Sequence, residues 1–210
     1  MRAETEQDGS AITAMSTELT FPRVHRIRLD YVPREDRIAA HLTMIGGDGR
    51  VAWLSRRLVG GACQHMDQTL KRSHPASEGE PAHDTVMALE HIGMRAEVAA
   101  QQAEATPDAA GGADEVDEPT VWDHYLVTEI HLEQQDSALI LAFSGHSLAA
   151  TPAADLPTGP IAALALTRAH AHEILRLLTL QAEQADWRLQ PAIGWLDSPH
   201  AASRSGSDTH

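Results

Sequence analysis

Two arginines and a histidine form the chain's most informative set of polar side chains. Arg26 and Arg28 alternate with the apolar residues Ile27 and Leu29, and His41 occupies the polar side of the next alternating segment. Because successive side chains of a strand point to opposite faces of a sheet, we expect these three residues to share one exposed face. Such a face can bind an anionic partner.

A second pair of cations, Arg56 and Arg57, comes directly after the predicted third strand, at the predicted start of a helix. Positive charges at a helix N-terminus oppose the helix dipole, so nothing local favours them there. We therefore expect a partner-binding basic face made of Arg26, Arg28, His41, Arg56 and Arg57. The alternative is internal neutralisation by acids of the second half of the chain, such as Glu129 and Glu133.

Thirteen histidines invite a metal hypothesis, but their spacing gives little support for one. The best cluster is His170, His172 and Glu173, at the predicted start of a helix. Helical residues two positions apart diverge by about 200°, so the two imidazoles cannot share a ligand. We expect no metal and no other cofactor. These three residues are the weak candidates for a metal-dependent enzyme, which is the second alternative function.

Nucleophilic chemistry finds no better support. Cys63 is the single cysteine and lies in the middle of a predicted helix, whereas a reactive thiol needs a helix N-terminus or a paired base. The glycine-rich segment 46–49 lacks the Lys and Ser/Thr of a phosphate loop. The sequence therefore predicts a buried, inert thiol and a protein that is not an enzyme. The proline-containing loop 145–160 stays open as either functional or disordered.

Charge is distributed unevenly along the chain. The 210 residues include 16 Lys/Arg and 30 Asp/Glu, a net charge of −14. Residues 22–73 contain ten basic and five acidic residues, whereas residues 74–210 contain five and 21. The acidic total disfavours general nucleic-acid affinity. No apolar run is long enough to span a bilayer, and the lone cysteine favours a reducing, cytoplasmic compartment.

Hydrophobic periodicity predicts an α+β fold. Strict alternation predicts three strands, a helix capped by Ser55 follows, and the same order then recurs with a helix capped by Thr167. The predicted strands cover residues 24–31, 38–44, 50–54, 126–132, 139–143 and 161–166. We predict two pseudo-repeated βββα units, each an antiparallel sheet with its helix on one face, plus a bridging helix over about 85–105. In this duplication Ile27 corresponds to Ile130 and Leu54 to Leu166.

Composition divides the chain into five segments. We expect a disordered N-terminal tail, a first βββα unit with the bridging helix, a flexible acidic linker, a second unit with a docked tail, and a disordered C-terminal tail. Their boundaries are residues 1–20, 21–105, 106–120, 121–198 and 199–210. The docked tail is predicted from Trp187 and Trp195, two of the four tryptophans.

The leading interpretation is a non-enzymatic cytoplasmic interaction or accessory protein whose partner is another protein or a second copy of the chain. The alternative is a nucleic-acid binder that uses the basic face of the first unit. In topology alone, duplicated sheet-plus-helix units resemble the Whirly-type and Pur-alpha-type single-strand nucleic-acid binders. That resemblance implies a basic and aromatic sheet face, although no sequence motif is shared.

Overall fold

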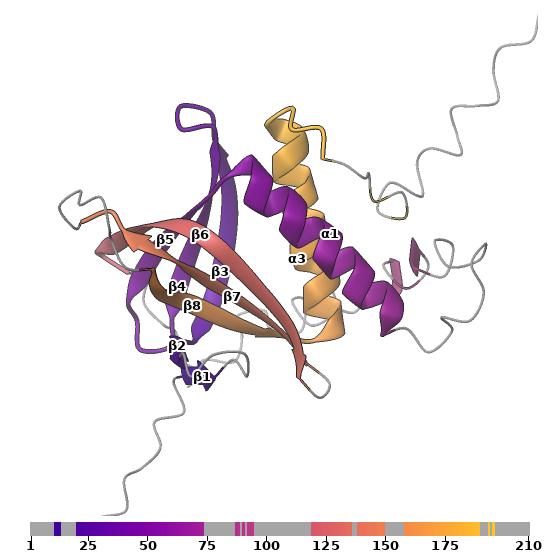
Figure 1. Ribbon diagram of the computed structural model, residues 1–210, viewed down its shortest axis with the longest axis horizontal. Helices are drawn as coiled ribbons and strands as arrows, with labels where there is room; N and C mark the ends of the chain where they lie inside the picture. Colours follow the sequence, from indigo (N-terminus) through magenta and orange to yellow (C-terminus); the bar gives the residue numbers. More distant parts are fainter. Residues whose placement is uncertain are drawn as a thin grey trace, which may run out of the picture.

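Six strands form one continuous curved sheet in the computed structural model (Figure 1). The structure describes residues 11–13, 20–73, 87–88, 90, 92–94, 119–135, 138–149, 158–189, 193 and 195. The strands follow one another in chain order across the sheet. Their bounds are β3 (Val24–Val32), β4 (Arg37–Met44), β5 (Gly49–Leu54), β6 (Trp122–Gln135), β7 (Ala138–Ser147) and β8 (Gly159–Leu166).

The pairing pattern confirms the α+β class and corrects the prediction of two antiparallel sheets. Neighbouring strands are antiparallel except β5 and β6, which pair in parallel from Gly49/Trp122 to Trp53/Leu126. This parallel junction joins the two groups of three strands into a single mixed sheet. The sheet also curves, since Arg23, just before β3, forms a parallel bridge with Ala163 of β8.

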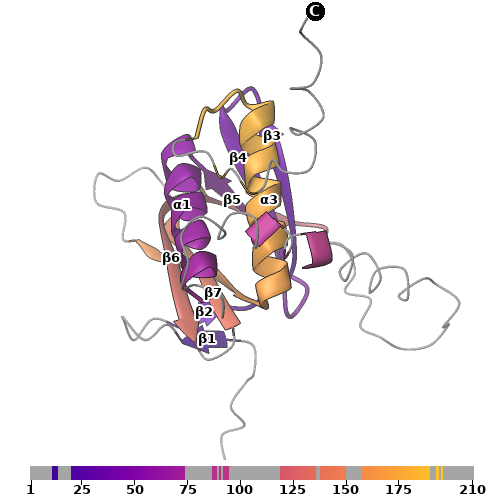
Figure 2. The same cartoon turned by 90° about the vertical axis from the view of Figure 1, so that its right-hand side faces the viewer.

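Two helices cover one face of the sheet, α1 (Arg56–Arg72) and α3 (Arg168–Gln184) (Figure 2). They run antiparallel, because the Arg168 side chain at the start of α3 donates to the Leu70 carbonyl at the end of α1. The described residues of segment 87–94 are also helical and lie within the predicted bridging helix. Among the described helices, none is both long and apolar enough to cross a membrane.

The core lies between the helices and the inner face of the sheet. Its fully buried members include Leu42 and Leu54 from the strands and Met66 and Leu175 from the helices. Each such side chain contributes about 1.5–3 kcal/mol by leaving water. Trp187 and Trp195 also belong to this core, at 5% and 1% exposure.

The pairing register of the sheet shifts at three places, and two of these β-bulges, in β3 and β6, break the alternation that the sequence suggested. The pairing of β3 with β4 shifts between Val24 and Arg26, so Val24 packs against the core and His25 is exposed. Strict alternation over residues 24–31 would place His25 on the face of Ile27, and the bulge prevents this because it inserts one residue. A second bulge, between Val127 and Glu129, likewise turns Val127 rather than Thr128 toward the core.

Helix caps and the tight turn agree with the sequence in most details. The Thr167 side chain accepts a hydrogen bond from the His170 backbone N–H, as an N-cap should. Ser55 occupies the N-cap position of α1 but makes no side-chain capping bond. Gly46 and Gly47 have φ of 117° and 93°, conformations that favour glycine, and they connect β4 to β5.

The remaining segment predictions are tested only in part. Residues 11–13 form strand β1 (Ala11–Thr13), which pairs with β2 (Thr20–Pro22), although the sequence placed them in a disordered tail. Most of the acidic linker 106–120, the C-terminal tail 199–210 and residues 150–157 of the long loop lie outside the described residues.

Candidate functional site

Three of the predicted basic residues lie together on the outer face of the sheet, the face opposite the helices. Arg28 of β3 is the direct cross-strand partner of His41 in β4, and Arg26 is the partner of Thr43. Their neighbours Ile27 and Leu29 pack in the core, so the guanidinium groups point away from it. Arg26 and Arg28 are exposed, and the His41 side chain is 24% exposed.

The structure separates the other two basic residues from this group. Arg56 and Arg57 occupy the first turn of α1, in the helical layer that covers the inner face. The Arg56 guanidinium donates to the Arg188 carbonyl oxygen beyond the end of α3, at 3.4 Å. A carbonyl after a helix C-terminus favours a cation, so Arg56 has a local partner that the sequence did not reveal.

One carboxylate neutralises part of the outer face. Asp30 Oδ2 lies 2.9 Å from Arg28 Nε and 3.5 Å from His41 Nε2. The counter-ion therefore comes from the same strand as Arg28, whereas Glu129 pairs with His131 instead. Exposed pairs of this kind contribute about 0–1 kcal/mol to stability. Arg26 has no ion pair among the residues that the structure describes.

Two tryptophans and a histidine join this face across the parallel β5–β6 junction. Trp122 lies beside Gly49, and its ring packs edge-on against His41 with ring centroids 5.4 Å apart. Trp53 stacks beside His124 at 6.0 Å, and its Nε1–H donates to His124 Nδ1 at 3.2 Å. Gly49 is required here, because a Cβ at this position would lie 2.9 Å from the Trp122 ring.

These side chains define the outer-face patch: Arg26, Arg28, His41, Trp53, Trp122 and His124. Sequence reasoning missed the last three because it began the strand of β6 at Leu126 and predicted no pairing between β5 and β6. The alternation of Trp122 and His124 at the start of β6 was the available signal. The patch combines imidazoles with tryptophan rings and guanidinium groups, and Trp and Arg are enriched at interaction hot spots.

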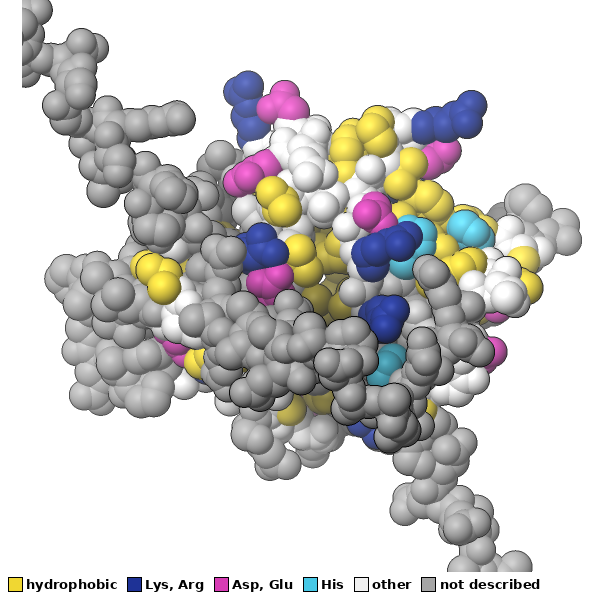
Figure 3. All heavy atoms as spheres, turned by 180° about the vertical axis from the view of Figure 1, so that it is seen from behind, with side chains coloured by type: hydrophobic (Ala, Val, Ile, Leu, Met, Phe, Trp, Pro, Cys, Tyr) yellow, Lys and Arg dark blue, Asp and Glu magenta, His cyan; other side chains and the backbone are white. Residues whose placement is uncertain are grey.

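The charge of the described residues is mixed rather than uniformly basic. The described residues contain 13 Lys/Arg and 12 Asp/Glu, so the acidic excess of the chain lies in the remaining residues. On the side of the molecule that Figure 3 shows, basic, acidic, histidine and apolar side chains of the described residues lie side by side. A mixed surface favours partners with defined groups over a uniform polyanion.

The weak metal candidates are not brought together. His170 is exposed beside its cap residue Thr167, whereas His172 is buried against Trp195 and lies 3.6 Å from Glu90. Glu173 binds Arg176 with both oxygens, and this bond raises the pKa of that guanidinium. Across the described part of the chain, no three His, Cys, Asp or Glu side chains are grouped to hold a metal ion.

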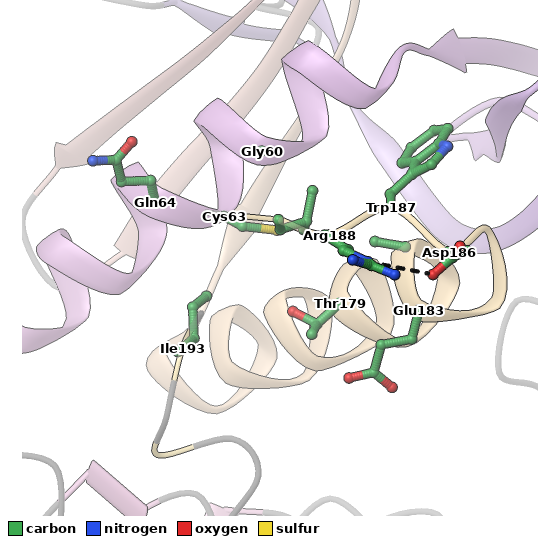
Figure 4. A pocket seen from close by; sticks show the side chains of 11 residues that line it. Gly60, Cys63, Gln64, Thr179, Glu183, Asp186, Trp187, Arg188 and Ile193 are labelled. Atoms are coloured by element: carbon green, nitrogen blue, oxygen red, sulfur yellow. Dashed lines mark ion pairs between the residues drawn. The ribbon is translucent and has the colours of Figure 1, made fainter. Parts of the chain in front are cut away.

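Cys63 is buried, as predicted, and lines a cavity between α1 and α3 (Figure 4). Burial raises the pKa of its thiol to about 12, although a hydrogen bond with Thr179 lowers it in part. A thiol with this pKa is almost fully protonated at neutral pH and is a poor nucleophile. The cavity therefore lacks an activated cysteine.

The fold and the surface define this chain as an α+β protein with a six-stranded mixed sheet, two described long helices on its inner face and an aromatic and cationic patch on its outer face. Comparison with protein-family models, with curated proteins and with solved structures found no match to this chain.

Proposed function

We propose that this chain is a non-enzymatic interaction protein that captures an anionic protein partner through the outer-face patch. The observation that carries the proposal is that the half-buried Trp53, stacked on the exposed His124, shares the outer face of strands β3 to β6 with the exposed Arg28. Aromatic rings supply contact area, and the guanidinium group supplies a directed bond to a carboxylate.

An internal duplication explains why this surface stands out. We propose that β3–β4–β5–α1 and β6–β7–β8–α3 are two copies of one unit. The pairing of Ile27 with Leu42, and of Leu42 with Arg50, recurs as Ile130 with Phe143 and Phe143 with Ala162. The corresponding strands are thus offset by 103, 101 and 112 residues, and Leu54 corresponds to Leu166.

The irregular features support the same correspondence. The bulge between Val24 and Arg26 recurs between Val127 and Glu129, again 103 residues later. Both helices have 17 residues, and all five buried residues of α1 have a buried counterpart 112 residues later in α3. The buried pairs are Val59/Ala171, Ala62/Ile174, Cys63/Leu175, Met66/Leu178 and Leu70/Ala182.

The outer sheet faces of the two proposed copies differ in what covers them. On the second copy Phe21 is buried over Ile140, Ala142 and Ala163, so a segment of the chain itself covers that surface. Val51 pairs with His124 on the first copy as Ala163 pairs with Arg23 on the second, so Trp122 stands in place of Phe21 and His124 beside it is exposed. Its surroundings are polar as well, since His41 replaces Ala142. The first copy therefore offers the surface that is open to a partner.

The double variant Arg26→Ala/Arg28→Ala is expected to fold normally and to lose partner capture. Because the side chains of Arg28 and its partner Asp30 are 61% and 48% exposed, the free energy of unfolding should change by less than about 0.5 kcal/mol. The yield of partner in a quantitative pull-down from the native host should fall at least tenfold, more steeply in low salt than in high salt.

The matched control removes two charges elsewhere. Arg34→Ala/Arg57→Ala replaces two exposed arginines that lie outside the patch, and it should capture the partner like wild type. Trp53→Ala should lose the same partner as the Arg26/Arg28 variant. Unchanged capture by the Arg26/Arg28 variant, or equal loss in the control, contradicts the proposal. Light scattering of the pure protein shows whether the partner is a second copy.

Single-stranded nucleic acid is the second candidate, favoured by the same stacked rings and guanidinium groups. Bases stack on aromatic side chains while cations track the backbone. An oligothymidine titration at several salt concentrations tests it. Binding that weakens with salt and is lost on Trp53→Ala supports this candidate, and no binding at low salt removes it.

A further inference from the structure

The cavity between α1 and α3 has a volume of about 260 Å³ and a mixed lining. Cys63 of α1 and Thr179 of α3 line it from the two helices, and Trp187 and Ile193 lie toward opposite ends (Figure 4). The exposed residues Glu183, Asp186 and Arg188 also belong to its lining. An engineered apolar cavity of about 150 Å³ binds benzene, so this cavity has room for a somewhat larger ring system.

The corresponding place in the other half of the molecule is filled by an indole ring. Trp195 is 1% exposed, packs edge-on against His172 with ring centroids 5.1 Å apart, and donates its Nε1–H to Asp67 Oδ1 at 2.6 Å. By the 112-residue offset, His172 corresponds to Gly60, and Asp67 corresponds to Thr179. Gly60 and Thr179 both line the cavity.

Three differences between the two places either enlarge the cavity or keep an acceptor. Gly60 has no side chain where His172 places an imidazole, and Cys63 is smaller than the corresponding Leu175. Thr179 keeps an oxygen where Asp67 has its carboxylate. Its hydroxyl donates to the Leu175 carbonyl at 2.9 Å, and a hydroxyl oxygen that donates can still accept.

We infer that this cavity is a binding site for a small planar aromatic molecule of the indole class, with its ring between α1 and α3 and its N–H donating to Thr179 Oγ1. The inference rests on the duplication proposed above but not on the outer-face patch. The cavity volume suits a two-ring compound and excludes much larger ligands. The thiol of Cys63 adds a polarisable contact for the ring.

Calorimetric titration of the full chain with indole and with indene tests the site, because indene has the same shape without the N–H. We expect saturable binding of one indole per chain, about fivefold tighter than indene, as one net hydrogen bond provides. In Thr179→Val the affinity for indole should fall to that for indene, and the affinity for indene should stay within twofold of its wild-type value.

Two neighbouring glycines provide a matched pair of variants. Gly60→Leu places a side chain into the cavity and should weaken indole binding at least tenfold. Gly61 is one position further along the same helix and faces open space. Gly61→Leu should therefore bind indole with an affinity within twofold of the wild-type value. If Gly60→Leu does not fold by circular dichroism, Cys63→Leu, which introduces the residue found at position 175, takes its place.

The outcomes are separable from those of the proposed function. The Arg26→Ala/Arg28→Ala variant should bind indole like wild type, and Gly60→Leu should capture the protein partner like wild type. Absence of saturable indole binding to wild type overturns the inference. Equal affinity of the folded Gly60→Leu and wild-type proteins also overturns it, because the ligand then binds elsewhere.

Discussion

Replacing Arg168 by alanine is expected to lower the free energy of unfolding by about 3 kcal/mol. Its guanidinium group binds both carboxylate oxygens of Glu90, the Leu70 carbonyl at 2.8 Å and the Ser73 hydroxyl oxygen at 2.6 Å. The side chains of Arg168 and Glu90 are only 24% and 13% exposed, so the variant leaves a mostly buried carboxylate without its cation. Denaturant unfolding at neutral pH measures the loss.

The start of the other long helix supplies the control for this variant. Arg56 is likewise the first residue of its helix, α1, but its guanidinium donates to the Arg188 carbonyl over a longer distance of 3.4 Å, and its side chain is exposed. Arg56→Ala should therefore change stability by no more than about 0.5 kcal/mol. Arg168→Lys keeps the positive charge but loses the bidentate geometry. Its free energy of unfolding should lie between those of the wild type and Arg168→Ala.

Equal losses at the two arginines contradict this assignment, because the difference rests on Glu90 and on burial. The same comparison bears on the expectation that cations at a helix start require an external partner. Arg168 lies at the start of α3 but also beside the last turn of the antiparallel α1, whose carbonyls favour a cation. A neighbouring helix thus satisfies the charge that the helix's own dipole opposes.

The individual elements were predictable because each depends on local sequence. Alternation over residues 24–31 predicts β3, and Thr167 marks the start of α3 by its capping hydroxyl. The bulges at His25 and Thr128 were not predictable from alternation, since one extra residue changes which side chains face the core without leaving a signature in residue type.

The parallel β5–β6 junction was missed for a different reason. Trp53 and Leu126 pair across α1 and the segment that follows it, and a pairing over such a sequence separation has no local period to reveal it. Half of the outer-face patch depends on this pairing, so Arg26, Arg28 and His41 were found while Trp53, Trp122 and His124 were not. The cavity depends on the docking of two helices and was equally hidden.

Alkylation of native Cys63 at neutral pH should be about a thousandfold slower than alkylation of the same thiol in denaturant. Burial raises its pKa from the ordinary value of 9.0 to about 12, and three pH units reduce the thiolate fraction by that factor. An exposed thiol on the same helix, Gln68→Cys in a Cys63→Ala background, should react at nearly the denatured rate. Comparable native rates for the two thiols contradict the assignment.

The same pKa shift makes stability fall in alkaline solution. Below about pH 9 the Cys63 thiol is protonated in the folded and in the unfolded chain, so its contribution to the free energy of unfolding is fully present. Above that pH the unfolded chain loses the proton first, so stability falls as the pH rises toward the folded pKa of about 12. At pH 10 the wild-type protein should have lost about 1.4 kcal/mol more than Cys63→Ala, relative to pH 8. Parallel stability curves for the two proteins between pH 8 and pH 10 show instead that the native thiol ionises as readily as a free one.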